Sequence, residues 1–401
     1  MGWYIGLMSG TSMDGVDAVL ARFEAPSSPA TAIETASQPP SDRIPAAHFQ
    51  HAVSISLPDA LRHELMALNH SGPDELLRSA RAAQALVGHY SQAVQQLLAE
   101  AHLHPADIIA IGAHGQTVRH HPNEGISIQL NAPALLAEQT GIDVIADFRS
   151  RDLAAGGQGA PLVPPFHALL FTGHEPRAVI NIGGMANITR LAGQKPSKPG
   201  QAEPGAPAPS FYGFDCGPGN VLMDLWCAQH RHEPYDHEGR WAASGRCHPT
   251  LLNALLAEPW LKLPPPKSTG RDLFNAPWLQ QKLSTLSLHS VSAADIQATL
   301  LEYTTRNIID ALVQWAPDTQ TLIICGGGAL NSQLMRRLQQ QAAQQLGATV
   351  HSSAEFDVHP QYLEAYAFAW LAFAYDQKIN AGHPQVTGAR QPTCLGARYY
   401  A

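Results

Sequence analysis

The stretch that decides the fold is Ser9-Gly10-Thr11-Ser12-Met13-Asp14-Gly15-Val16-Asp17, which joins two apolar, β-prone runs, residues 3–8 and 16–23. Its glycines let backbone N–H groups approach a ligand, and the hydroxyls of Thr11 and Ser12 can donate hydrogen bonds to phosphate oxygens. Two strands joined by such a turn predict a hairpin that holds phosphate. Turns of this composition also join strands in many proteins, so the stretch alone leaves a plain hairpin open as the alternative.

The same pattern returns in the middle of the chain, where residues 178–182 and 186–191 are short β-prone runs around Gly183-Gly184. Duplication of one domain explains the repetition, and two unrelated hairpins are the alternative. Later, the apolar run 321–325 leads into Gly326-Gly327-Gly328. These glycines can lie against a flat ligand and precede a helix whose N-terminus faces it. The three glycine turns together indicate an ATPase that holds its nucleotide between two lobes.

Composition narrows the class of protein. A chain of 401 residues with 45% hydrophobic and 14% charged residues predicts a globular protein of two domains, with a ligand cleft between them. The net charge of −8 argues against a nucleic-acid partner and favours a small-molecule ligand. Five cysteines without C-x-x-C spacing indicate reduced thiols. No apolar run reaches the roughly 18 residues of a membrane span, so we expect no membrane partner and a cytoplasmic protein.

The remaining periodicity predicts an α/β protein. Further strands are expected at residues 48–56, 108–113 and 143–146, and helices at 74–102, after 131–133, at 218–230, at 248–257 and at 292–316. The segment 25–46, rich in Pro, Ser and Ala, is expected to be a loop. The segment 192–210, rich in Gln, Lys, Pro, Gly and Ala, is expected to be a surface insertion without a part in the chemistry.

With these residues assigned, the chain resembles the anhydro-N-acetylmuramic acid kinase family, within the acetate/sugar kinase, Hsp70 and actin superfamily. The resemblance runs nearly end to end. Its motifs are Gly6 to Asp17, Gly112-Ala113-His114-Gly115-Gln116-Thr117, Ala146 to Asp152, Gly156 to Pro164, Asn181 to Asn187, Gly213-Phe214-Asp215-Cys216-Gly217-Pro218-Gly219-Asn220, Pro266 to Arg271, and Glu364 to Trp370.

The resemblance implies two ribonuclease H-like lobes, the actin-like ATPase fold, around a nucleotide and sugar cleft. Residues 1–150 plus about 372–401 would form the first lobe, and 151–371 the second. The implied reaction converts 1,6-anhydro-N-acetylmuramic acid, ATP and water into N-acetylmuramic acid 6-phosphate and ADP, a step of peptidoglycan recycling. ATP, Mg²⁺ and a cytoplasmic homodimer are implied with it. A kinase of another sugar or carboxylate on the same fold is the alternative.

The resemblance also assigns site residues. Asp215 would be the base that accepts a proton from the water attacking C1, whereas a mere cap for a helix beginning near Pro218 is the alternative. The nucleotide would be bound by Ser9, Gly10, Thr11, Ser12, Met13, Asp14, Gly15, Asp17, Asn181, Gly183, Gly184, Gly326, Gly327 and Gly328. The sugar would be bound by His114, Gln116, Thr117, Asp147, Arg149 and Glu364.

Three assignments stay open. Many kinases of the superfamily begin the first phosphate turn with Asp-x-Gly, and here Leu7-Met8-Ser9-Gly10 stands in its place, so the Mg²⁺ ligand is open with Asp14 as the nearest candidate. Arg149 could pair with the lactyl carboxylate of the sugar or form a structural ion pair with Asp147 or Asp152. The close spacing of His230, His232, Asp236 and His237 suggests zinc, but a solvated loop is the favoured interpretation.

Overall fold

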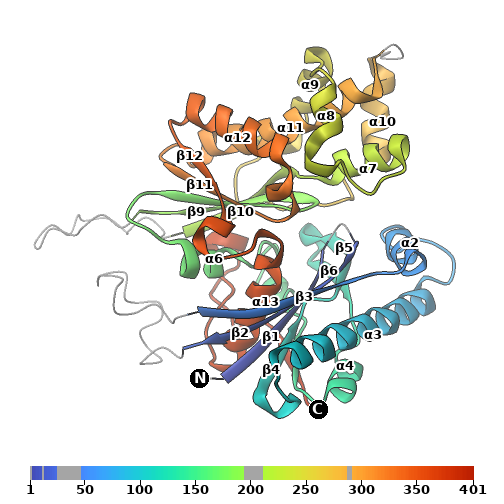
Figure 1. The fold of residues 1–401 in the computed structure, drawn as a ribbon, viewed down its shortest axis with the longest axis vertical. Helices are drawn as coiled ribbons and strands as arrows, with labels where there is room; N and C mark the ends of the chain where they lie inside the picture. Colours follow the sequence, from blue (N-terminus) through green and yellow to red (C-terminus); the bar gives the residue numbers. More distant parts are fainter. Residues whose placement is uncertain (1, 11–12, 25–46, 194–210, 287–290) are drawn as a thin grey trace, which may run out of the picture. The chain divides into compact units, whose positions relative to one another are not determined.

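The computed structural model describes residues 2–10, 13–24, 47–193, 211–286 and 291–401. Thr11, Ser12, residues 25–46 and most of the 192–210 insertion lie outside the described residues. The chain forms two compact units, each with its own sheet (Figure 1). The first unit holds the described residues up to Thr172, Phe211 and Tyr212, and Tyr362–Ala401, and the second holds Gly173–Gly193 and Gly213–Gln361.

The sheet of the first unit has the strand order β13-β7-β4-β1-β2-β3. Its strands are β1 (Gly2–Ser9), β2 (Gly15–Phe23), β3 (Ala47–Ser56), β4 (Ile108–Ala113), β7 (Val144–Ala146) and β13 (Ala397–Tyr399). β1 and β2 form the predicted antiparallel hairpin, and β4 runs parallel to β1 on its other side. The expected strands and the hairpin at the start of the chain are therefore confirmed.

Different helices cover the two faces of this sheet. Successive side chains of β1 point to opposite faces, so neighbouring residues contact different helices. Ile5 and Leu7 belong to the hydrophobic core that includes the buried side of α3 (Glu75–Ala101). Tyr4 faces the other way, and its ring meets Phe373 of α13 (Leu363–Asp376) edge-on with centroids 5.6 Å apart.

α13 packs directly on the sheet backbone through two glycines. Gly6 of β1 and Gly112 of β4 are partners in the parallel register. A Cβ atom on Gly6 would fall on the carbonyl oxygen of Ala365, and one on Gly112 would fall on that of Phe368. Only glycine leaves room for the helix backbone at these two positions. We call the pair Gly6 and Gly112 the glycine seat of α13.

Shorter elements complete the first unit. They are α2 (Asp59–Ala67), η2 (Pro105–Asp107), β5 (Gln116–His121), η3 (Pro122–Glu124), β6 (Ile126–Leu130), α4 (Pro133–Thr140), α5 (Ser150–Ala154), α6 (Pro164–Phe171) and α14 (Pro384–Thr387). β5 and β6 form a two-stranded antiparallel sheet that the sequence did not predict.

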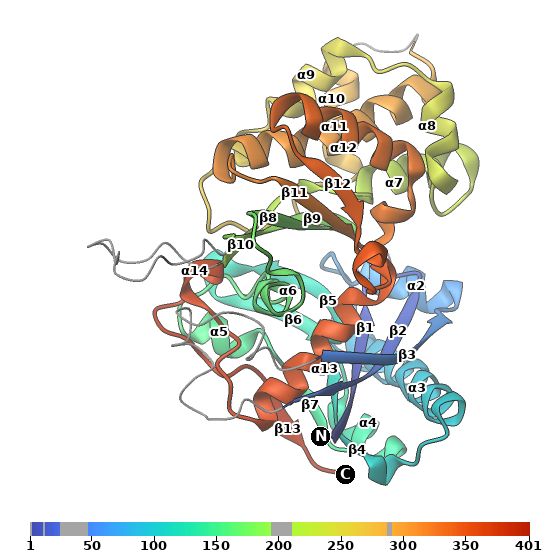
Figure 2. The same cartoon turned by 60° about the vertical axis from the view of Figure 1, so that its left-hand side comes forward.

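The sheet of the second unit has the order β10-β9-β8-β11-β12 (Figure 2). Its strands are β8 (Arg177–Ile182), β9 (Met185–Leu191), β10 (Phe211–Pro218), β11 (Thr321–Cys325) and β12 (Thr349–Ser352). β8 and β9 are an antiparallel hairpin, and β11 is parallel to both β8 and β12. The order matches β3-β2-β1-β4-β7 of the first unit strand for strand, as the duplication predicted.

Helices make up most of the rest of the second unit. They are α7 (Val221–Arg231), η4 (His237–Gly239), α8 (Arg240–Ser244), α9 (Pro249–Leu256), η5 (Pro259–Lys262), α10 (Ala276–Thr285), α11 (Ala293–Trp315), η6 (Gly327–Leu330), α12 (Ser332–Gln345) and η7 (Ser353–Phe356), with η8 (Pro360–Tyr362) where the chain returns to the first unit. The predicted helix at 218–230 begins three residues late, because β10 occupies the residues up to Pro218.

The unit boundaries differ from the predicted 150 and 372. α5 and α6 stay with the first unit, where the fully buried Asp152 accepts a hydrogen bond of 2.7 Å from the Oγ1 atom of Thr387. All of α13 also belongs there, because of its glycine seat.

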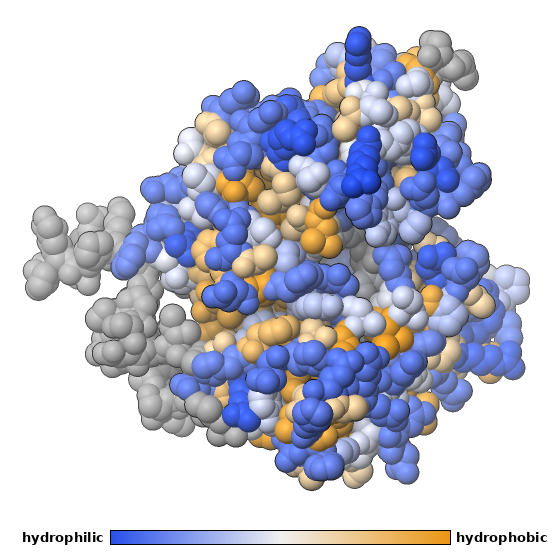
Figure 3. Space-filling model, viewed as in Figure 1, coloured by the Kyte–Doolittle hydropathy of each residue, from blue (hydrophilic) through white to orange (hydrophobic). Residues whose placement is uncertain are grey.

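Surface and core divide in the usual way. Hydrophilic side chains cover most of the face seen in Figure 3, and hydrophobic ones form small separate groups on it. In the part of the chain that the structure describes, no helix is both long and apolar enough to cross a membrane.

Candidate active site

The turn after β1 is closed by a hydrogen bond of 3.1 Å from the backbone N–H of Met13 to the carbonyl of Gly10. Met13 has a left-handed φ of 59°, and its side chain is buried. A Cβ on Gly15 would meet the carbonyl oxygen of Ile55 at 2.7 Å, so glycine is required there. Asp14 is exposed. A buried methionine thus anchors the turn, while its acidic residue faces solvent.

A hydrogen bond between Ser9 and Gln116 connects the end of β1 to β5. The Oγ of Ser9 donates to Oε1 of Gln116 at 2.5 Å, and both residues are buried. Asp17, on the other strand of the hairpin, accepts a hydrogen bond of 2.5 Å from the Oγ of Ser54. The side chains of Ser9 and Asp17 therefore contribute to the shape of this region through contacts with the protein itself.

His114 and Arg149 are joined by a hydrogen bond in the first unit. Arg149 donates from Nη2 to Nε2 of His114 at 2.8 Å, and from Nη1 to the carbonyl of Gly159 at 2.7 Å. A guanidinium can only donate, so Nε2 carries no proton and the imidazole is neutral. Burial, and then the charge of Arg149, lower the pKa of His114 well below its usual range. The neutral imidazole thus helps to orient a charged guanidinium.

The carboxylates proposed as structural partners of Arg149 accept hydrogen bonds from other donors. Asp152 accepts from the amide of Gly159 at 2.8 Å and from Thr387, and burial raises its pKa. Asp147 is exposed, with a left-handed φ of 55°, and accepts from the Oγ of Ser150 at 2.5 Å.

Two further predicted sugar ligands lie on other elements of the first unit. Thr117 follows Gln116 on β5, and its hydroxyl accepts a hydrogen bond of 3.2 Å from Gln129. Glu364 is half-buried in the first turn of α13. Within the first unit, hydrogen bonds join His114 to Arg149 and Ser9 to Gln116.

In the second unit, the Gly183-Gly184 turn is bonded to the start of α7. The amide of Gly219 donates to the carbonyl of Gly184 at 2.9 Å, and that of Asn220 donates to Gly183 at 2.8 Å. The side-chain amide of Asn220 also donates to the carbonyl of Ile182 at 3.1 Å. The turn is thereby held rigidly against the N-terminus of a helix.

The third glycine motif lies beside this turn. Gly326 has a φ of 75°, and a Cβ there would press on the side chain of the buried Asn181 and on the backbone of Ile182. Gly327 is exposed, and a Cβ on it would meet only the side chain of Asn220, at 3.7 Å. The helix expected after the motif is α12, which begins after the short η6 and is capped by Asn331.

Asp215 lies within β10, with only 7% of its surface exposed. Its Oδ2 accepts a hydrogen bond of 2.9 Å from the backbone N–H of Thr269, and its own N–H donates to the carbonyl of Lys267 at 3.1 Å. α7 begins at Val221 with Asn220 as its N-cap residue. The capping alternative for Asp215 is therefore wrong, because the residue is part of a strand.

Lys267 belongs to the motif from Pro266 to Arg271, and no role was predicted for it. Its side chain is 5% exposed, and Nζ donates to the carbonyl of Leu261 at 2.8 Å and lies 4.5 Å from the centre of the Trp260 ring. The apolar residues and three prolines before Lys267 could have predicted that the lysine is buried. They could not have predicted its contacts with Trp260 and Leu261.

Asp236, the carboxylate of the possible zinc site, has a structural role instead. Asp236 is buried and accepts hydrogen bonds of 2.8 Å from the amides of Trp241 and Ala242, at the start of α8. The described ranges contain no group of three or more His, Cys, Asp or Glu side chains that could hold a metal ion.

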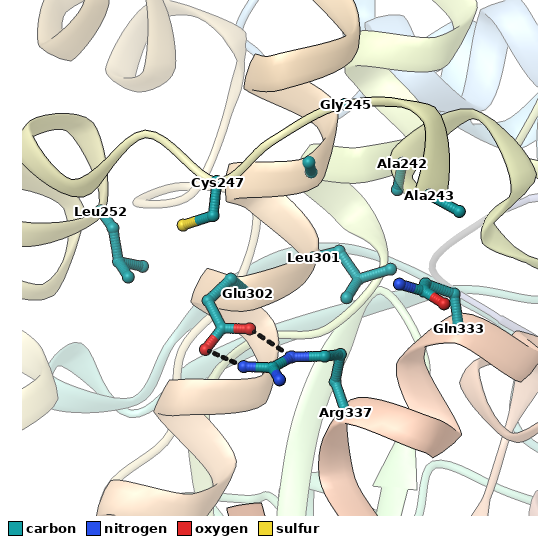
Figure 4. Close-up of a pocket in the computed structure, with 10 residues that line it drawn as sticks. Ala242, Ala243, Gly245, Cys247, Leu252, Leu301, Glu302, Gln333 and Arg337 are labelled. Atoms are coloured by element: carbon teal, nitrogen blue, oxygen red, sulfur yellow. Dashed lines mark hydrogen bonds and ion pairs between the residues drawn. The ribbon is translucent and has the colours of Figure 1, made fainter. Parts of the chain in front are cut away.

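A pocket of about 260 Å³ lies among the helices of the second unit, lined by Cys247, Leu252 and Leu301 among others (Figure 4). Glu302 of α11 accepts two hydrogen bonds, of 2.8 and 2.9 Å, from Arg337 of α12. This pair balances the charges at the pocket and joins the two helices. None of the predicted site residues lines it.

The chain is similar to known proteins over nearly its whole length. The family model for anhydro-N-acetylmuramic acid kinase matches residues 2–401. A protein of that name from Bordetella petrii is 52% identical over 99% of this chain and 96% of its own. One from Pseudomonas fluorescens is 48% identical over 100% of this chain and 99% of its own. Among solved structures, a ROK family glucokinase from Streptomyces griseus matches 92% of this chain and 99% of its own, with 14% identity and a TM-score of 0.40.

Proposed function

The chain belongs to the anhydro-N-acetylmuramic acid kinase family, and from that premise we propose that Asp215 is the base of an ATP-dependent kinase that opens and phosphorylates its sugar. The observation that carries the proposal is the buried carboxylate of Asp215, fixed by the amide of Thr269. Water attacks C1 while the carboxylate takes its proton, and the C1–O6 bond breaks. The released O6 then attacks the γ-phosphorus of ATP, and N-acetylmuramic acid 6-phosphate and ADP are formed.

Phosphoryl transfer depends mainly on positioning and on neutralising phosphate charge. We propose that backbone amides of the Gly10 to Gly15 turn and of the Gly183-Gly184 turn contact the phosphates, and that Gly326, Gly327 and Gly328 border the adenosine. Mg²⁺ bound to a nucleotide needs only one or two protein carboxylates, because phosphates and water supply its other oxygens. The exposed carboxylate of Asp14 fits that requirement and would hold the ion.

For the sugar, we propose that Arg149 pairs with the lactyl carboxylate while His114 and Gly159 orient the guanidinium. A bidentate pair between arginine and a carboxylate requires a fixed direction of the guanidinium plane. The hydrogen bonds from Nη1 and Nη2 supply that direction. Gln116, Thr117, Asp147 and Glu364 would contact the hydroxyl and acetamido groups.

Replacing His114 by phenylalanine should raise KM for the sugar about tenfold and change kcat less, because Arg149 loses an acceptor that orients it. The ring contact with Phe368, 4.7 Å between centroids, can be kept by the new side chain. Steady-state kinetics against sugar concentration measure the effect. His167→Phe is the matched control, because His167 is also buried in the first unit, with a pKa lowered by burial to about 3. Equal KM values in the two variants would contradict the role of His114.

Replacing Gly327 by aspartate should weaken ATP binding at least about tenfold, because it puts a negative charge beside a polyanionic ligand. The backbone tolerates a side chain there, since a Cβ meets nothing closer than 3.7 Å. Isothermal titration with a non-hydrolysable ATP analogue measures the dissociation constant. Gly327→Ala should bind like the wild type, and unchanged affinity in the aspartate variant would remove Gly327 from the nucleotide site.

We propose a place in peptidoglycan recycling, a cytoplasmic location and a homodimer, and the five free thiols support a reducing compartment. ADP release on addition of 1,6-anhydro-N-acetylmuramic acid in ¹⁸O-water, with mass spectrometry of the product, tests the reaction. Label at C1 is expected. Activity only with another sugar or carboxylate would favour the alternative kinase.

A further inference from the structure

Two hydrogen bonds join the loop 266–269 to Asp215 of β10. The strand amide of Asp215 donates to the carbonyl of Lys267 at 3.1 Å, and the loop amide of Thr269 donates to the carboxylate at 2.9 Å. The loop therefore determines where the carboxylate of Asp215 lies. Any movement of Thr269 would be passed on to the oxygen that accepts its hydrogen bond.

The side chain of Lys267 holds this loop from the other side. Nζ donates to the carbonyl of Leu261 at 2.8 Å and lies 4.5 Å from the centre of the Trp260 ring. Both partners belong to η5. A hydrogen bond and a cation–π contact thus connect the loop to a second, separate element of the unit.

A buried ammonium group is costly unless its charge is balanced. Lys267 is 5% exposed, and its Nζ donates to a neutral backbone carbonyl, that of Leu261. Burial lowers its pKa, and the charged forms of Cys216 and Asp215 oppose that shift. Because burial raises the pKa of the Cys216 thiol, that thiol is neutral at neutral pH, which leaves Asp215 as the negative charge that opposes the lowering of the lysine pKa.

We propose that Lys267 is a positioning residue for Asp215, which holds the loop that orients the carboxylate and supplies the positive charge that favours its ionised form. The inference rests on the proposed role of Asp215 as the base. An apolar side chain would fill the same space at lower cost, so packing alone does not explain an ammonium here. The neighbouring negative charge does.

The test is the pH dependence of kcat in Lys267→Met. We expect kcat at pH 7 to fall about tenfold or more, and the rise of kcat with pH to move at least about half a pH unit upward, because the carboxylate loses a nearby positive charge. KM for ATP should change little. Lys267→Arg keeps the charge and should restore the wild-type pH profile in part.

Two further variants keep the test decisive. Lys282→Met is the matched control, since Lys282 lies 5.3 Å from the ring centre of Trp278 in the same unit and also faces a carboxylate, Glu258. It should leave the pH profile unchanged. If Lys267→Met does not fold, Trp260→Leu removes the ring beneath the ammonium and should shift the profile in the same direction by a smaller amount.

The outcomes separate the two proposals. If Asp215→Asn keeps its activity, the proposed base is wrong whatever Lys267 does. If Asp215→Asn is inactive but Lys267→Met keeps the wild-type rate and pH profile, the role of Lys267 is overturned alone. A loss of thermal stability in Lys267→Met with an unchanged pH profile would likewise show a purely structural lysine.

Discussion

Replacing Asp215 by asparagine is expected to lower turnover by about 10² or more, because the amide keeps the size of the carboxylate but cannot accept the proton of the attacking water. The amide of Thr269 can still donate to the oxygen of the new side chain, so the local structure should persist. The affinities for sugar and ATP should change little. Because ring opening generates the O6 nucleophile, cleavage of the anhydro bond and release of ADP should fall together.

The measurement is turnover by ADP release, with anhydro-bond cleavage followed by mass spectrometry of the same samples. Asp224→Asn is a suitable control, because Asp224 is a half-buried carboxylate in the first turn of the neighbouring α7. It should keep most of its activity. A folded Asp215→Asn enzyme with more than about a tenth of wild-type turnover would exclude Asp215 as the base.

Replacing Gly112 by valine is expected to lower the free energy of unfolding by about 3 kcal/mol or more, because the side chain needs the space of the Phe368 carbonyl in α13. The helix backbone cannot give way as a flexible side chain would. α13 would have to leave a sheet that it now contacts directly. Chemical unfolding followed by intrinsic fluorescence measures the loss.

Gly6→Val, at the partner position on β1, should have a similar effect. Gly88→Ala is the contrasting variant, since no atom lies within 4 Å of a Cβ built at this position of α3. It should stabilise the protein by up to about 1 kcal/mol through helix propensity. Equal stabilities of the Gly112 and Gly88 variants would show that α13 does not depend on its glycine seat.

The sequence predicted those strands and helices that local patterns of residues determine. The hairpins β1–β2 and β8–β9 were recognised because apolar, β-prone runs lie on both sides of glycine turns. β10 was missed, because Phe211–Pro218 contains two glycines and a proline and has little β propensity of its own; it is a strand because β9 supplies hydrogen bonds. α13 was missed as a helix because it is buried on nearly all sides and shows no 3.6-residue period.

For the candidate site, too, some features could be predicted from the sequence and others could not. Motifs made Asp215 and Arg149 candidates for the site, since residue type and resemblance indicate what chemistry they can perform. The contacts that orient them were not predictable, because Thr269 lies 54 residues from Asp215 and His114 lies 35 from Arg149. Only the folded backbone brings such pairs within hydrogen-bond distance.

The glycine seat of α13 has a consequence for synthesis on the ribosome. β1 and β4 emerge early, but the helix that covers their second face ends only at Asp376. At ordinary elongation rates this delay is on the order of tens of seconds. During that time the newly made strands present Tyr4 and the bare backbone of Gly6 and Gly112 without their native cover. We therefore expect the partly made chain to be more prone to aggregation than the finished protein, because the surface that α13 covers is exposed until the helix has been made.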